Sequence, residues 1–351
     1  MPPLVRLEPF LLHESSMVRD SVGFHFFQTW PDKEDLAPLV LEACRRYGDE
    51  PCMNLLSFGC RFPLSARGLL EALRALADIR PPFVEQWVSL APLSLTRGRA
   101  EVLRSVLSRR AIARLDRRTC FHDAAPEELW RRLSALSRKL DLRAMAPGDL
   151  DETDDLLEAL ANVERPENVT AMIRDLDDCD MRWALLELAG VMGLTEVADV
   201  LVDLLACGDD VLVRASVESL ARIRSENTVA AIAARYPRGS RRFRSFALSV
   251  LKAVKLDSSE SLLRDLAGAE TDPALRARVF DALRFHFTAG SERLLRQELE
   301  NPSSWMLPEA IAKALYVFGE LRGASAPPPP FEGDEIYFHL SFEERDEPAP
   351  R

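Results

Sequence analysis

Apolar residues recur at helical spacing over most of the chain, and between residues 150 and 320 they recur as a repeated unit. Four segments align on an arginine that precedes an apolar stripe, at Arg182, Arg214, Arg244 and Arg276, with spacings of 32, 30 and 32 residues. Apolar positions three and four residues apart lie on one face of a helix. We therefore predict an amphipathic helix in each of the four segments.

Shorter amphipathic stretches lie between these segments and predict a first helix for each unit. They begin near small or polar residues suited to helix capping, at Leu194, Glu226, Ser258 and Gly290. Turn-forming sequences separate the helices at 207–210, 236–240 and 269–273. Pro273 is placed at the start of a helix, where its missing N–H is tolerated.

A two-helix unit of about 30 residues cannot bury its own apolar face, so neighbouring units must stack. The sequence therefore predicts an all-α, α-α superhelix. We expect four leucines of the repeated stripe to be buried between neighbouring helices: Leu188, Leu220, Leu251 and Leu283.

The pattern Val/Leu-Arg-x-x-Ala-x-x-x-Leu of these units resembles the HEAT family, in particular the short bacterial type found in phycobilisome lyases. The resemblance covers about half of the chain and implies an α-solenoid of HEAT-like repeats. We divide the chain into irregular N-terminal HEAT-like repeats (1–145), regular HEAT-like repeats (146–322) and a Pro-rich acidic tail (323–351). The tail opens with GASAPPPP, which cannot continue a helix, and alternation between Ile336 and Phe342 predicts a strand within it.

Composition favours a globular cytoplasmic protein. The formal net charge of the 351 residues is −11, which opposes a general affinity for nucleic acid or an anionic membrane. No charge-free run approaches a membrane span, and the six cysteines form no CxxC pair. We expect no membrane association, no nucleic-acid partner and no disulfides.

Candidate chemistry is sparse. The deoxyhypusine hydroxylases are enzymes of the HEAT fold that carry several His-Glu pairs around two irons, whereas this chain has one such pair, His13-Glu14. No GxGxxG, Walker or GxSxG motif occurs. We expect no catalytic residue, no metal and no cofactor.

Charge is distributed in blocks. Residues 97–143 hold thirteen Arg or Lys against six acids, residues 235–255 hold seven basic residues and no acid, and residues 149–180 hold twelve acids against two arginines. One interpretation is that these blocks are solvated helix faces in an arginine-rich chain. The other is that the basic blocks bind phosphate or an acidic protein.

The repeat arginines have a structural interpretation. Acids precede three of them, so we expect a ladder between units from Asp180, Asp210 and Asp272 with Arg182, Arg214 and Arg276. In the unit of Arg244 the acid is replaced by Arg241 and Arg242, which leaves Arg244 without the usual partner. We expect the three arginines to repel one another unless solvent or an anion screens them.

This exception defines a candidate partner-binding site. It comprises Arg235, Arg238, Arg241, Arg242 and Arg244. Its expected ligand is an acidic segment of another protein or of the chain's own tail, at Glu343, Glu344, Asp346 and Glu347.

The function that follows is a non-catalytic protein-interaction scaffold or adaptor that uses the concave surface of the solenoid. One alternative is a nucleic-acid-binding protein that resembles the HEAT-repeat alkylpurine DNA glycosylases. Such a protein needs aromatic residues beside its groove, for which the candidates are Trp87, Trp130, Trp183 and Trp305. A bilin lyase or its chaperone is a further alternative.

Overall fold

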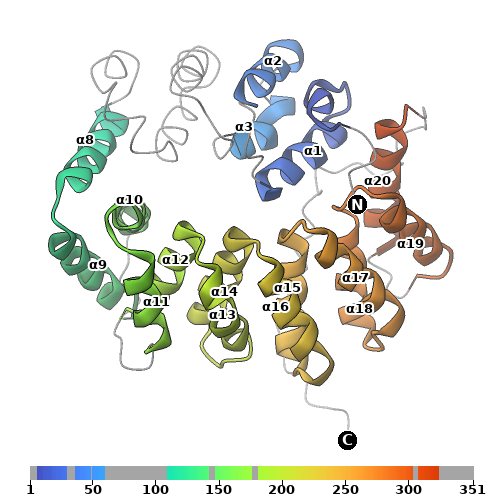
Figure 1. Cartoon of the computed structure of the whole chain (residues 1–351). Coiled ribbons are helices and arrows are strands. Elements are labelled where there is room, and N and C mark those ends of the chain that lie inside the picture. The colour runs from blue at the N-terminus through green and yellow to red at the C-terminus, as the bar shows by residue number, and fades with distance from the viewer. Residues whose placement is uncertain are drawn as a thin grey trace, which may run out of the picture.

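The computed structural model describes residues 6–29, 36–48, 50–59, 109–141, 147–175, 181–302 and 307–323. Within these ranges all regular structure is helical, with 16 α-helices and four short 3-10 helices (η). The helices follow one another along a curved path (Figure 1). The expectation of an all-α fold is thus confirmed, while the acidic tail and its expected strand lie outside the described residues.

The first part of the path contains helices of varied length and spacing. They are η1 (Glu8–Leu12), α1 (Ser16–Thr29), α2 (Ala37–Tyr47), η2 (Glu50–Cys52), α3 (Met53–Gly59), α8 (Arg109–Asp123), α9 (Pro126–Asp141), α10 (Pro147–Val163) and α11 (Pro166–Arg174). None of the described helices combines the length and apolarity needed to cross a membrane.

The second part alternates the first and second helices of the repeated units. Its elements are α12 (Arg182–Met192), η4 (Thr195–Val197), α13 (Ala198–Leu204), α14 (Asp210–Ile223), α15 (Glu226–Arg235), η5 (Tyr236–Arg238), α16 (Arg241–Ala253), α17 (Asp257–Ala269), α18 (Pro273–Leu283), α19 (Ala289–Glu300) and α20 (Leu307–Leu321). The second helices α12, α14, α16, α18 and α20 pack against one another in series, and the first helices α13, α15, α17 and α19 do the same. Both sets of predicted repeat helices are confirmed.

The core runs continuously between the units. The four leucines of the repeated stripe are fully buried, as expected. Between α12 and α14 the backbones approach closely at Gly190, where a Cβ atom would lie 2.7 Å from the Cα atom of Ser219. The Ser219 hydroxyl donates to the carbonyl of Leu186 at 2.7 Å. A glycine and a small polar residue therefore let these two helices approach at this point.

Polar side chains at the helix starts fix the unit boundaries. The Asp209 carboxylate accepts hydrogen bonds from the second and third N–H groups of α14, and Asp272 does the same for α18. The hydroxyls of Ser225 and Thr288 cap α15 and α19. Pro273 opens α18, as expected. These caps satisfy N–H groups that have no partner within the helix.

The N-terminal helices are organised around a buried arginine. Arg19 is 1% exposed and donates to the carbonyls of His13 at 2.7 Å and Pro51 at 2.9 Å. Cys44 and Cys52 are buried in the same region, as small apolar side chains would be. Arg19 therefore ties the segment before α1 to η2, which precedes α3.

The first described helix packs against the last one, a contact that the sequence did not indicate (Figure 1). His13 Nε2 lies 3.2 Å from a carboxylate oxygen of Glu320 on α20. The ring of Phe24 on α1 lies 4.9 Å from the ring of Phe285, which follows α18. His25 Nδ1 lies 3.4 Å from the Phe285 carbonyl. The curved path thus brings its two described ends together.

Truncation of the leucine stripe tests the assigned register. Leu251→Ala removes a side chain that is fully buried between α16 and its neighbours. We expect a loss of about 2 to 5 kcal/mol in the free energy of unfolding, because the cavity cannot collapse completely. Urea unfolding followed by circular dichroism measures the change, and a variant as stable as the parent would show that the register is wrong.

Candidate functional site

The arginines of the block at 235–244 reach acids of neighbouring units. Arg242 Nη2 lies 2.5 Å from Asp210 of the preceding unit, and Arg241 Nε lies 2.8 Å from Asp272 of the following unit. Arg235 Nε lies 2.6 Å from Asp203 on the preceding first helix. The repulsion expected between Arg241 and Arg242 is therefore offset, because the stacking of units supplies acids about 30 residues away in sequence.

Arg244 has the most buried partner of the block. Its Nη1 atom lies 3.0 Å from both carboxylate oxygens of Glu270, whose side chain is 1% exposed. The hydroxyl of Tyr236 donates to the same carboxylate at 2.9 Å, and burial raises the pKa of this tyrosine. Arg244 therefore balances a buried negative charge, contrary to the expectation that it has no partner.

The remaining ladder residues differ in their environments. Arg276 lies 3.3 Å from Glu298 on α19, so it also pairs with the next helix. Arg182, Arg214 and Arg238 are exposed, and Asp180 lies outside the described residues. Asp210 and Asp272 form the expected contacts between units, but with Arg242 and Arg241 in place of the arginines that follow them in sequence. The five-residue candidate site is thus dispersed over several contacts between units.

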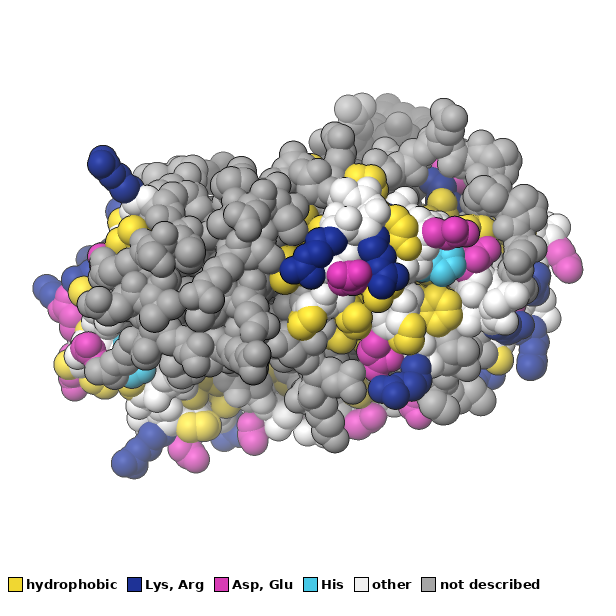
Figure 2. Space-filling view, turned by 90° about the horizontal axis from the view of Figure 1, so that it is seen from above, with side chains coloured by type: hydrophobic (Ala, Val, Ile, Leu, Met, Phe, Trp, Pro, Cys, Tyr) yellow, Lys and Arg dark blue, Asp and Glu magenta, His cyan; other side chains and the backbone are white. Residues whose placement is uncertain are grey.

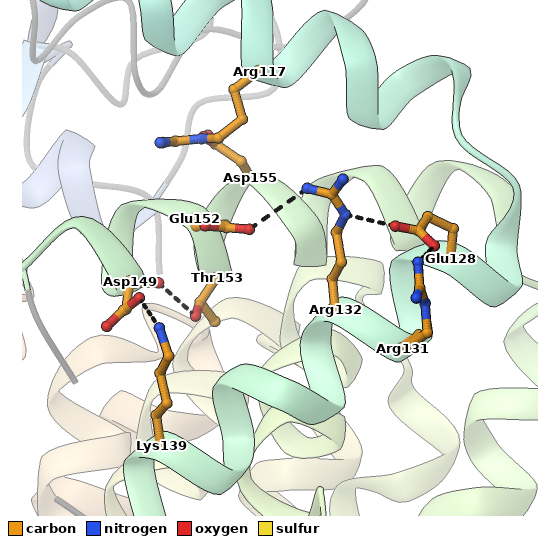
Figure 3. Close-up of polar contacts among 9 residues, drawn as sticks. All are labelled: Arg117, Glu128, Arg131, Arg132, Lys139, Asp149, Glu152, Thr153 and Asp155. Carbon is orange, nitrogen blue, oxygen red and sulfur yellow. Dashed lines mark hydrogen bonds and ion pairs between the residues drawn. The ribbon is translucent and has the colours of Figure 1, made fainter. Parts of the chain in front are cut away.

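The other two charge blocks face each other. Side chains of α8 and α9, from the basic block, point toward carboxylates of α10, from the acidic block (Figure 3). Lys139 Nζ lies 2.6 Å from Asp149, and Arg132 Nη1 lies 3.9 Å from Glu152. In the described residues, basic side chains of α9 thus pair with carboxylates of α10.

Arginines surround a buried carboxylate at the centre of this interface. Asp155 is 1% exposed, and Arg117 donates to it at 2.8 Å. Arg114 and the fully buried Arg118 lie 3.6 and 3.5 Å from its other oxygen. Burial raises the pKa of Asp155 above its ordinary value, although the arginines act to lower it. This cluster holds α8 against α10.

Acidic and basic side chains also alternate on the face turned toward the viewer in Figure 2. Among the described atoms there, neither sign forms a continuous patch, and apolar side chains lie between the charges.

A different set of charges occupies equivalent places near the ends of the second helices. Counting from the repeat arginine, the position eight residues on is Gly190, Arg222, Lys252 and Arg284 in successive units. The position five residues on is Glu187, Ser219, Ser249 and Asp281. We name the charged members of these two positions the charge row: Glu187, Arg222, Lys252, Asp281 and Arg284.

The charge row has an acidic end on α12 and α14. Arg222 Nη1 lies 3.3 Å from Glu187, whose side chain is 14% exposed. Burial raises the pKa of Glu187 to about 7, and Glu218 and Asp154 raise it further while Arg222 lowers it. Near neutral pH this carboxyl group is therefore divided between its charged and neutral forms.

The other end of the charge row is basic and surrounds one aromatic ring. Lys252 Nζ, Lys255 Nζ and Arg284 Cζ lie 5.0, 5.4 and 4.4 Å from the ring centroid of Phe285. Asp281 bridges two of the cations, at 2.6 Å from Lys252 Nζ and 2.7 Å from Arg284 Nε. We name Lys252, Lys255 and Arg284 the cation cluster. Cations near an aromatic face are stabilised by its quadrupole.

The connection that carries Phe285 is buried and has a restrained backbone. Every residue from Asp281 to Thr288 is buried, and Phe287 has a positive φ of 46°. A bulky side chain rarely adopts this conformation, which is found where surrounding structure enforces it. A small pocket adjoins the connection, lined by Arg284 and Phe285 together with Ser21 of α1 and Lys313 of α20.

Two buried histidines border the cation cluster. Burial, reinforced by Lys255, lowers the pKa of His25 to about 3, and the same two effects lower the pKa of His286 well below its ordinary value. The imidazole Nε2 of His286 has no hydrogen-bond partner among the described residues. These neutral rings therefore add no positive charge to an already cationic site.

The sequence contained a signal for the charge row that the repeat alignment did not use. The repeat arginines mark the helix starts, whereas the residue eight positions later is glycine in one unit and a basic residue in the next three. Trp130 and Trp183 pack against the core, and Trp87 and Trp305 lie outside the described residues.

The geometry defines an all-helical repeat protein. In its described ranges no three His, Cys, Asp or Glu side chains gather closely enough to hold a metal ion. No protein-family model and no curated protein matches the chain.

The solved structures similar to it include the following two. Human deoxyhypusine hydroxylase in complex with glycerol is 15% identical, with a TM-score of 0.31 over 79% of this chain and 99% of that one. An engineered protein is 12% identical, with a TM-score of 0.28 over 89% of this chain and 98% of that one.

Substitutions of Arg244 and Arg241 compare the stability contributed by a buried ion pair with that contributed by an exposed one. Arg244→Gln leaves the buried Glu270 carboxylate without its cation, and we expect a loss of about 2 to 3 kcal/mol in the free energy of unfolding. Arg241→Gln is the matched control on the same helix, because its side chain is 58% exposed. We expect the control to cost less than about 1 kcal/mol. Equal losses in the two variants, measured by urea unfolding, would contradict this assignment.

The raised pKa of Glu187 makes stability depend on pH. Its folded pKa of about 7 exceeds the ordinary 4.5, so the folded chain retains a proton that the unfolded chain releases between these values. This carboxyl therefore destabilises the fold as pH rises through that window, by at most about 3 kcal/mol.

The side chain of the Glu187→Gln variant is neutral at every pH. Its free energy of unfolding, measured relative to that of the parent, should therefore increase from about pH 5 to about pH 8. Urea unfolding at both pH values measures the difference. Glu42→Gln, on an exposed side chain of α2, is the control and should show no such relative gain. A Glu187→Gln difference that does not change with pH would rule out the raised pKa.

Proposed function

We propose that the protein is a non-catalytic scaffold or adaptor that binds another protein along the charge row. The observation that carries the proposal is the variation of charge at equivalent positions on successive second helices. The HEAT resemblance of the repeats supports it, because stacked helix pairs present extended surfaces for binding.

The buried leucines stay the same from unit to unit, whereas the residues of the charge row change. In each of the four units a leucine six or seven residues after the repeat arginine is fully buried. The position five residues after that arginine varies from acid to hydroxyl, and the position eight residues after it varies from glycine to arginine and lysine. Variation beside a constant framework is what recognition of an irregular partner surface requires.

The order of charges indicates the kind of partner. Along the charge row, Glu187 lies on α12, Arg222 on α14, Lys252 on α16, and Asp281 and Arg284 at the end of α18. A partner that crosses three units would meet a change of sign. We infer a partner segment with a basic part and an acidic part, because complementary charges set orientation and suppress wrong partners.

The arginines of the block at 235–244 are not the main contact with the partner in this proposal. Its arginines other than Arg238 already contact acids of neighbouring units, and an acidic segment would have to displace those contacts. The charge row is paired in the same way, so what favours it as the main contact is the change of its charges from unit to unit; an acidic partner at Arg238 and Arg241 remains an additional candidate.

Two charge-neutral double variants test the proposal. Glu187→Gln with Arg222→Gln removes one pair between units within the charge row. Asp203→Asn with Arg235→Gln removes one pair between units on the first helices and serves as the matched control. Proteins captured from the native host by each variant are compared with those captured by the parent.

We expect the charge-row variant to lose its partner and the control to retain it, with a dissociation constant raised about tenfold or more in the charge-row variant. Equal capture by both variants would place the interface elsewhere. Capture that disappears after nuclease treatment would favour the nucleic-acid alternative, and visible absorbance of a retained pigment would favour the bilin alternative.

A further inference from the structure

The cation cluster carries more positive than negative charge. Lys252 contacts one carboxylate, Asp281, which is shared with Arg284. In the described part of the chain no carboxylate lies within ion-pair distance of Lys255. Its ammonium group donates to the carbonyl of Lys252, near the end of α16. The site therefore has two ammonium groups and one shared carboxylate.

Such an imbalance is unfavourable in a poorly hydrated place. The Lys252 side chain is 24% exposed, and aromatic and apolar groups border the cluster. Cations removed from water need a compensating charge or they lose their proton. The C-terminal dipole of α16 and the face of Phe285 offset part of this cost, since both attract cations. They supply no full negative charge.

We propose that Lys252, Lys255 and Arg284 bind a small divalent oxyanion of the phosphate class. Lys252 and Lys255 are both half-buried residues, and their ammonium groups lie near the same ring, so one anion bound beside Phe285 would reach both. Arg284 adds a planar donor group that suits oxygen atoms of a phosphate. Two negative charges match the two lysines, while Asp281 remains with Arg284.

The proton equilibria of the cluster agree with this site. Burial lowers the pKa of Lys255 well below its ordinary value, and Lys252 lowers it further. Burial also lowers the pKa of Lys252, against the effect of Asp281. A bound anion reverses this by favouring the charged ammonium forms, so the two lysines and the anion stabilise one another.

Thermal unfolding of the full chain with increasing inorganic phosphate tests the site. At about pH 8 phosphate is mainly a dianion. Sodium chloride holds the ionic strength constant. We expect the melting temperature to rise with phosphate concentration, because a ligand of the folded state stabilises it by mass action. Acetate should give a smaller rise, since one charge leaves one lysine uncompensated. No rise with phosphate would overturn the proposal, and an equal rise with acetate would overturn the preference for a dianion.

Variants separate the site from general charge effects. Lys255→Gln should reduce phosphate affinity about tenfold or more by removing a charge-assisted contact. It also removes a poorly hydrated cation, so we expect it to melt no lower than the parent without phosphate. Lys255→Arg keeps the charge and should retain binding. Lys139→Gln, which removes an exposed lysine of α9, is the control. A phosphate response unchanged in Lys255→Gln would overturn the site.

Calorimetry of phosphate binding in two buffers with different ionisation enthalpies gives a second readout. Because the anion raises the pKa of Lys255, binding at mildly alkaline pH should take up protons, and Lys255→Gln should abolish part of this uptake. The charged and titratable groups around Lys255 are Lys252, Asp281, Arg284, Arg224, His25 and His286. Binding without proton uptake by the parent would contradict the role of Lys255.

The oxyanion site does not depend on the proposed protein partner. The variant Glu187→Gln with Arg222→Gln should keep its full phosphate response although it loses partner capture. Failure of the scaffold proposal and failure of the oxyanion site therefore give different results.

Discussion

The apolar stripe of each helix pair can be buried only by the next pair along the chain, and the other contacts depend on this stacking. Leu188, Leu220, Leu251 and Leu283 are fully buried on successive second helices. Their burial holds successive units against one another. Side chains about 30 residues apart in sequence thereby become neighbours, which is why so many polar contacts join consecutive units.

Stacking also explains why blocks of like charge are tolerated. The arginines at the start of α16 stand side by side in sequence, yet Arg241 pairs forward with Asp272 and Arg242 pairs backward with Asp210. The basic helices α8 and α9 face the acidic helix α10 in the same way (Figure 3). Repulsion within a helix is offset by attraction between helices, so a charge block alone does not identify a binding surface.

The contact between α1 and the last repeats gives the second-helix ends their unusual environment. Phe24 and His25 of α1 pack on the connection after α18, and they border the rings and cations around Phe285. Lys252 and Lys255 are partly removed from water there. The acidic end of the charge row lies on α12 and α14, away from the cation cluster along the repeat axis. There Glu187 is a partly buried carboxyl group whose pKa is raised. One row of equivalent positions thus offers two different chemical sites.

The sequence by itself determined the all-α class, the alternation of first and second helices from α12 to α19, the buried leucines and the helix start at Pro273. These features are local, because helical periodicity and capping depend on residues within a few turns of one another. Only the tertiary structure decided which acid each arginine meets, that α1 packs against α20, and that Lys252, Lys255 and Arg284 surround Phe285. Those outcomes depend on the rotation and separation of stacked units, which bring together residues far apart in sequence, such as His25 with Phe285 and His13 with Glu320.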